Sequence, residues 1–60
     1  MDDHERARMR KEIARLRSAL AGKKAMLVRL DVEKDERRIQ SLINEMTGIE
    51  AEIASIEMKL

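Results

Sequence analysis

Cysteine, proline, phenylalanine, tyrosine and tryptophan are all absent from this 60-residue chain. Without cysteine, the chain can form neither a disulfide framework nor a thiolate zinc site. Without aromatic residues, any core must be built from Leu, Ile, Val, Met and Ala. A chain this short also buries too little surface to be stable unless its packing is tight or a partner contributes.

Long apolar runs are missing as well, since no uninterrupted apolar stretch exceeds a few residues. A membrane-spanning helix needs about 20 consecutive apolar residues. A secretory signal needs a shorter apolar run behind an N-terminal positive charge, and none follows the N-terminal charges here. We therefore expect a soluble, cytoplasmic protein with no membrane partner.

Reactive side chains are scarce. His4 is the only histidine, and Ser18, Ser41 and Ser55 have no histidine close in sequence to activate them. The segment 22–24, Gly-Lys-Lys, lacks the upstream glycine and the following Ser or Thr of a phosphate loop. We expect no catalytic, cofactor-binding or metal site, and no enzyme.

Charged residues are abundant, at 42% of the chain, and are unevenly placed. Residues 1–30 hold nine Lys or Arg against four Asp or Glu, a net charge of +5, whereas residues 31–60 hold four against eight, a net charge of −4. A composition rich in Ala, Glu, Lys, Arg and Leu is typical of coiled coils and long helices. The two halves are electrostatic complements.

Apolar residues recur at alternating spacings of three and four in each half, which is the heptad pattern of a packed helix. Lys23 is the one charged residue in this series. The resulting seam comprises Met9, Ile13, Leu16, Leu20, Leu27, Leu30, Ile39, Leu42, Met46, Ile49, Ile53, Ile56 and Leu60.

The two seams do not join across "LDVEKDERRI", residues 30–39. Nine steps at about 100° amount to roughly two and a half turns, so one straight helix would point the seams to opposite sides. We therefore predict an all-α fold, an antiparallel coiled-coil-like hairpin with helices over about 3–31 and 36–60 and a turn over about 32–35. A continuous helix remains the alternative, with Ala21, Ala25, Val28 and Val32 extending the second seam backward in a staggered assembly.

A hairpin pairs seam residues whose numbers sum to 69, for example Leu16 with Ile53. Flanking charges agree with this register, because it opposes Arg10 to Glu57, Arg17 to Glu50, Glu12 to Lys59, and Glu33 to Arg38. The turn contains no glycine. Asp2 is expected to cap the first helix and Asp35 the second.

A second apolar side is expected, because one seam makes a small core. Its candidate residues are Ala14, Ala21, Ala25, Val28, Val32, Ile43, Ala51 and Ala54. Small side chains allow helices to approach closely. We expect this side to join a second copy in a four-helix bundle, or to dock another helical protein, as a scaffold or adaptor does.

Gly22 and Gly48 fall at nearly the same level of the hairpin. Three interpretations remain open: they permit close packing, they are local breaks at which Thr47-Gly48 opens a separate short helix through a capping box, or they have no role.

Nucleic-acid binding is the alternative function, because Arg8, Lys11 and Arg15 share the outer face of the first helix and are suited to phosphate contacts. In length, in its two heptad helices and in its acidic turn "LDVEKDE", the chain resembles the Rop family, small plasmid RNA-binding proteins in which two hairpins dimerise into a four-helix bundle. The resemblance implies an RNA-binding dimer. However, the aromatic side chain of that family's RNA-binding face has no counterpart here, so no functional residue is carried over.

Overall fold

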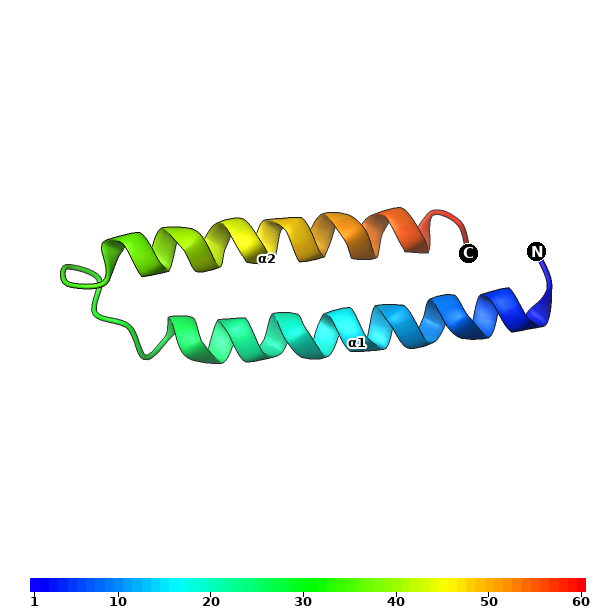
Figure 1. Ribbon diagram of the computed structural model, residues 1–60, viewed down its shortest axis with the longest axis horizontal. Helices are drawn as coiled ribbons and strands as arrows, with labels where there is room; N and C mark the ends of the chain where they lie inside the picture. Colours follow the sequence, from blue (N-terminus) through cyan, green and yellow to red (C-terminus); the bar gives the residue numbers. More distant parts are fainter.

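Two long helices lie side by side in antiparallel directions in the computed structural model, which describes residues 1–60 (Figure 1). Helix α1 spans Asp3–Leu27 and helix α2 spans Glu36–Glu57. The molecule measures 49 × 15 × 9 Å, whereas one continuous helix of this length would extend about 90 Å. The predicted all-α hairpin is therefore confirmed, and the continuous helix is excluded.

The start of α1 is set by a side-chain cap. The carboxylate of Asp2 accepts a hydrogen bond of 2.8 Å from the backbone N–H of Glu5. Asp3 and Glu5 add negative charge to the first turn, where it interacts favourably with the helix dipole. The predicted Asp2 cap is confirmed.

The end of α1 falls at Leu27, not near residue 31 as the sequence suggests. The chain then tightens, because the N–H groups of Arg29 and Leu30 donate to carbonyls only three residues earlier. No residue has a positive φ, so this exit from the helix needs no glycine. At the other end of the hairpin, α2 stops at Glu57 and the expected final residues 58–60 leave the helix.

Two aspartates organise the turn. The carboxylate of Asp31 accepts hydrogen bonds from the N–H groups of Glu33 (2.8 Å) and Lys34 (3.1 Å). The carboxylate of Asp35 accepts one from the N–H of Asp31 at 2.9 Å, and the Asp35 N–H donates to the Asp31 carbonyl at 2.8 Å. Asp35 does occupy the N-cap position of α2, but its side chain makes no capping bond, so that part of the prediction is wrong: its oxygen is engaged in the turn.

The core is a thin layer between the helices. Only Ile13, Leu16, Leu42 and Ile53 are buried, with exposures of 4–7%, and no polar residue is buried. Ile13, Leu16 and Ile53 form one cluster, against which the half-buried Ile49 and Ile56 pack.

Both glycines lie inside continuous helix. A Cβ added to either Gly22 or Gly48 would meet no atom within 4 Å, so neither glycine is needed for packing inside the hairpin. Helix α2 runs through Gly48 without a break, and the Thr47 hydroxyl donates to the carbonyl of Ile43 at 2.9 Å instead of capping a new helix. The capping-box interpretation is wrong.

Replacing Gly48 by Ala is expected to stabilise the fold by about 1 kcal/mol, because alanine loses less backbone freedom in a helix. The melting midpoint followed by circular dichroism should rise by about 4–8 °C. Ala51→Gly, at an exposed position of the same helix, is the matched control and should lower the midpoint by a similar amount. A fall after Gly48→Ala would mean that a contact outside the hairpin fills the space beside Gly48.

Candidate interaction surface

The seam residues lie between the two helices. Each is buried or half-buried except Leu60, which follows the end of α2 and is 45% exposed. Lys23, the charged residue in the series, is also half-buried. Its aliphatic stem lies at the seam, while its Nζ reaches Glu45 Oε2 on α2 at 2.9 Å. The ammonium group therefore lies outside the apolar seam, and the packing of the seam continues past Lys23.

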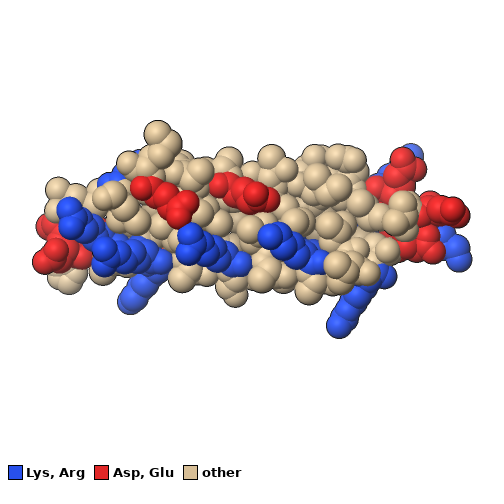
Figure 2. Space-filling view, turned by 180° about the vertical axis from the view of Figure 1, so that it is seen from behind, with Lys and Arg blue, Asp and Glu red and all other residues tan.

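One broad face of the hairpin carries basic residues along α1, after its acidic first turn, and acidic residues along α2. We call it the Arg17 face. On α1 it comprises Arg10, Ala14, Arg17, Ala21 and Lys24, followed by Val28 just after the helix, and on α2 it comprises Ile43, Thr47, Glu50, Ala54 and Glu57. These positions share a side because their seven-residue repeat is nearly two full helical turns. Seen from behind, Lys and Arg lie in a row along α1 and Asp and Glu lie over α2, with further acidic residues at both ends of the molecule (Figure 2).

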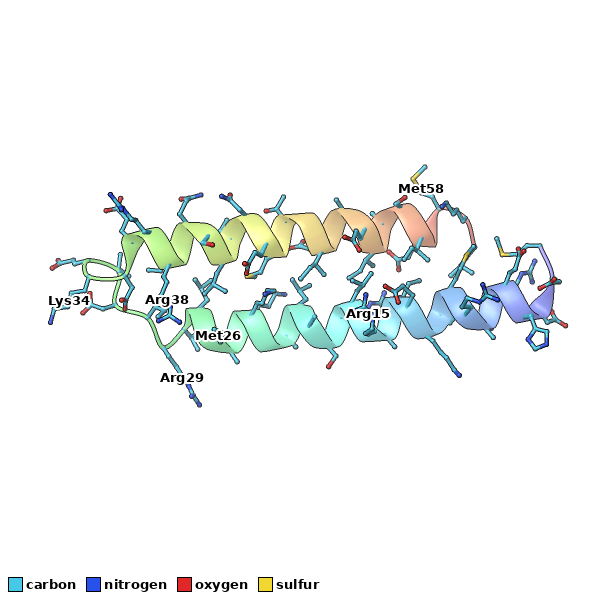
Figure 3. All side chains as sticks on the ribbon, viewed as in Figure 1. Arg15, Met26, Arg29, Lys34, Arg38 and Met58 are labelled. Carbon is cyan, nitrogen blue, oxygen red and sulfur yellow. The ribbon has the colours of Figure 1, made fainter.

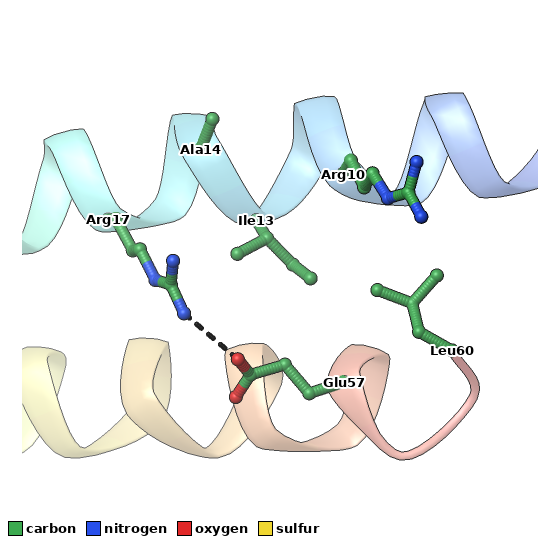
Figure 4. A pocket seen from close by; sticks show the side chains of 6 residues that line it. All are labelled: Arg10, Ile13, Ala14, Arg17, Glu57 and Leu60. Atoms are coloured by element: carbon green, nitrogen blue, oxygen red, sulfur yellow. Dashed lines mark hydrogen bonds and ion pairs between the residues drawn. The ribbon is translucent and has the colours of Figure 1, made fainter.

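A shallow hollow of about 280 Å³ lies on the Arg17 face at the open end of the hairpin, the end away from the turn. Arg10, Ile13, Ala14 and Leu60 line it together with an ion pair between Arg17 and Glu57 (Figure 4). The Arg17 Nη2 and Glu57 Oε2 atoms are 2.9 Å apart. Three of the six residues that line this hollow are apolar and three are charged.

None of the four charge pairs predicted by the register forms an ion pair: Glu12 pairs with Arg15 instead of Lys59, and Glu33 does not pair with Arg38. Arg17 pairs with Glu57 instead of Glu50, because its long side chain leans one helical turn toward the open end. Arg10 and Glu50 consequently have no ion-pair partner in the hairpin, whose three ion pairs are Arg15–Glu12, Arg17–Glu57 and Lys23–Glu45.

Of the residues considered for nucleic-acid contacts, Arg8 and Arg15 lie on the opposite broad face and Lys11 lies on the outer edge of α1 beside them. Arg15 points to the viewer's side of the hairpin in Figure 3 and donates through Nε to Glu12 Oε2 at 3.0 Å, with a second, ion-paired contact through Nη2. This hydrogen bonding lowers the pKa of the Glu12 carboxyl and raises the pKa of the Arg15 guanidinium. Arg8 and Lys11 lie together around a small hollow. Thus one of the three basic residues already has an anionic partner.

The eight residues of the predicted second apolar side are all exposed. Helical geometry places five of them on the Arg17 face: Ala14, Ala21, Val28, Ile43 and Ala54. Ala25 and Ala51 lie on the outer edges of the hairpin, and Val32 lies in the turn. The eight predicted residues therefore do not form one surface: five share the Arg17 face, and the other three lie outside it.

Large apolar side chains are exposed at both ends of the hairpin. At the turn end, Val28 is 83% exposed, Val32 79%, Met26 47% and Ile43 41%. At the other end, Met58 is 89% exposed and points away from α1 (Figure 3). Contiguous exposed apolar residues mark interaction sites more often than isolated ones do.

No arrangement of side chains suggests a metal centre, since no three His, Cys, Asp or Glu residues are grouped closely enough to hold an ion. Neither helix combines the length and the apolar character that crossing a membrane requires. Comparison with protein-family models, curated proteins and solved structures found no match to this chain. The likeness to the Rop family therefore remains one of architecture.

Two contributions were missed by sequence reasoning. The first is the Asp31 carboxylate, which organises the turn. The sequence indicates it only through the position of an aspartate two and three residues before the amides that it binds. The Lys23–Glu45 pair joins the two helices. The register could have predicted this ion pair, because Glu45 is adjacent to Met46, the residue that the register pairs with Lys23.

Proposed function

We propose that this chain is a non-enzymatic association module, a helical hairpin that acts as a scaffold or adaptor by packing its exposed helix surface against other helices. The observation that carries the proposal is the imbalance between exposed and buried surface. The hairpin exposes 4990 Å², whereas a folded monomer of 7.0 kDa typically exposes about 4,000 Å². The difference is close to the roughly 800 Å² that each partner buries in a standard interface.

The thin core supports the same proposal. Four buried side chains at about 1.5–3 kcal/mol each provide little stabilisation against the conformational entropy of ordering the chain. Val28, Val32 and Ile43 would add apolar burial if another helix covered them. Their β-branched side chains are not those that helix propensity alone would favour, which supports a packing role.

The proposal is tested by melting the chain at different concentrations. If folding is coupled to association, raising the chain concentration about a hundredfold should raise the midpoint by about 5–10 °C. Light scattering at the same concentrations should give a mass above that of one chain. A monomeric mass with a cooperative, concentration-independent midpoint would show that the hairpin is stable alone and would overturn self-association as its basis.

A further inference from the structure

The Arg17 face has the dimensions of a dimer interface. The hairpin is one helix thick, and its broad side measures 49 × 15 Å. That is about 700 Å² before side chains are counted, comparable to the roughly 800 Å² per partner of a standard complex. One such face is therefore sufficient to cover the excess exposed surface noted above.

The Arg17 face is better suited to self-association than the opposite face. Between Ala7 and Val28, the only charged side chains that α1 places on it are basic: Arg10, Arg17 and Lys24. On α2, Glu50 and Glu57 are acidic. The opposite face instead mixes signs along each helix, with Glu12 beside Arg15 on α1, and Glu45 and Glu52 followed by Lys59 on α2. Only the Arg17 face presents a basic helix next to an acidic one.

A two-fold dimer buries the same patch on both copies, and face-to-face hairpins can do so in two ways. With the two-fold axis along the helices, both turns lie at the same end, and α1 of each copy faces α2 of the other. With the axis across the helices, the turns lie at opposite ends, and α1 faces α1. Both arrangements are antiparallel between facing helices, so helix dipoles do not separate them.

Charge separates the two arrangements. Placing α1 against α1 would oppose Arg10, Arg17 and Lys24 of one copy to the same three cations of the other in reverse order, and like charges across an interface are costly. Placing α1 against α2 brings Arg10 near the level of Glu57 and Arg17 near the level of Glu50 of the second copy. It also offers partners to Arg10 and Glu50, which make no ion pair within the hairpin.

Exposed apolar side chains favour the same arrangement. Val28 and Ile43 both lie on the Arg17 face near the turn, where they are 83% and 41% exposed. With the turns together, Val28 of one copy lies at the level of Ile43 of the other, so both would be buried. With the turns apart, Val28 and Ile43 would each face the end of the second copy that carries Arg10 and Glu57. The charged groups there would lose their hydrating water without gaining a hydrogen-bond partner.

From these observations we infer that the partner of the Arg17 face is a second copy of this chain, stacked with both turns at the same end and with α1 of each copy against α2 of the other. The inference rests on the proposed function, because it specifies the partner and the geometry of that association. Ala14, Ala21 and Ala54 let the helices approach closely, while the Arg, Lys and Glu stems lie along the rim with their charges in water.

The distance between the two turns tests the inference directly. The chain has no cysteine, so Val32→Cys gives one labelling site, and Val32 is 79% exposed in the turn. With a nitroxide on Cys, pulsed EPR should find the turns about 10–25 Å apart, since packed helices are 8–10 Å apart. Turns at opposite ends would be separated by the 49 Å length of the hairpin. Ala51→Cys, near the middle of the molecule, should give a distance well below 49 Å in either arrangement.

Mass and distance together separate the possible results. A dimeric mass with the turns close together supports the inference. A dimeric mass with the turns about 49 Å apart overturns the inference and leaves the proposed function standing. A mass larger than a dimer also overturns the inference alone. A monomeric mass at every concentration, with full helicity, overturns the proposed function and the inference with it.

The choice of face is tested by charge reversal. Arg10→Glu should weaken dimerisation by about tenfold or more, because it places a like charge opposite Glu57 of the second copy at both symmetric contacts. Arg8→Glu changes the charge equally on the other side of α1 and should change the dissociation constant by less than about twofold. Circular dichroism checks that both variants remain helical. Equal effects of the two variants would exclude the Arg17 face as the interface.

Discussion

Leu16→Glu is expected to abolish cooperative melting and to remove most of the helical circular dichroism signal at room temperature. Leu16 is the least exposed side chain of the molecule, at 4%, and it packs against Ile13 and Ile53. Removing a buried leucine alone costs about 2–5 kcal/mol. Introducing a carboxylate there adds the cost of burying a charge without a partner. A single small core supplies only about 3–5 kcal/mol in all, so the variant should unfold.

Ser18→Glu is the matched control for this experiment. It introduces the same side chain two residues further along α1 at an exposed position, where the effect on stability should stay within about 0.5 kcal/mol. The measurement is a thermal melt of the three proteins at one concentration. A Leu16→Glu protein that keeps the midpoint of the unchanged chain would refute the register in which Leu16 packs on Ile53.

Replacing both turn aspartates, Asp31→Ala with Asp35→Ala, is expected to lower the melting midpoint by about 10 °C, corresponding to about 2 kcal/mol. The Asp31 carboxylate accepts two backbone hydrogen bonds and the Asp35 carboxylate accepts one. Bonds of this kind contribute about 0.5–1.5 kcal/mol each, and solvent competes for these exposed groups. Alanine also favours continued helix, so the variant loses its turn and gains helix propensity at once.

The measurements are a thermal melt and the maximum dimension from small-angle X-ray scattering. Partial conversion to extended helices should raise that dimension above the 49 Å length of the hairpin. Glu33→Ala is the control, because only its backbone N–H, not its side chain, takes part in the turn's hydrogen bonds. If the double variant and the control melt at the same temperature, the seams alone hold the turn and the aspartates do not.

Much of the fold follows from local pattern. The Asp2 cap is evident because an aspartate three residues before Glu5 can reach the free N–H groups of the first helical turn. The seam from Met9 to Ile56 consists of the residues that the structure buries or half-buries, because seven-residue spacing determines which side of a helix a residue occupies. The hairpin itself follows from the change of phase between Leu30 and Ile39.

Other features could not be read from spacing. Helix α1 ends at Leu27, not near residue 31, because hydrogen bonds of the turn compete with further helix and local propensity shows no break there. The pairing of Arg17 with Glu57 depends on how a long, flexible side chain leans. Gly22 and Gly48 looked like packing positions, but their surroundings within the hairpin are open.

By itself, the sequence determined that the chain is helical, that each half has one apolar stripe, and that the two stripes cannot share one straight helix. These properties depend only on residue spacing and the constant rotation per residue of an α-helix. Only the tertiary structure decided how the chain turns and which charges find partners. The turn relies on aspartate carboxylates binding backbone N–H groups, and the ion pairs join residues as far apart in sequence as Arg17 and Glu57. By pairing some charges and leaving Arg10 and Glu50 without a partner, that packing also determined which face is left with complementary charge to offer.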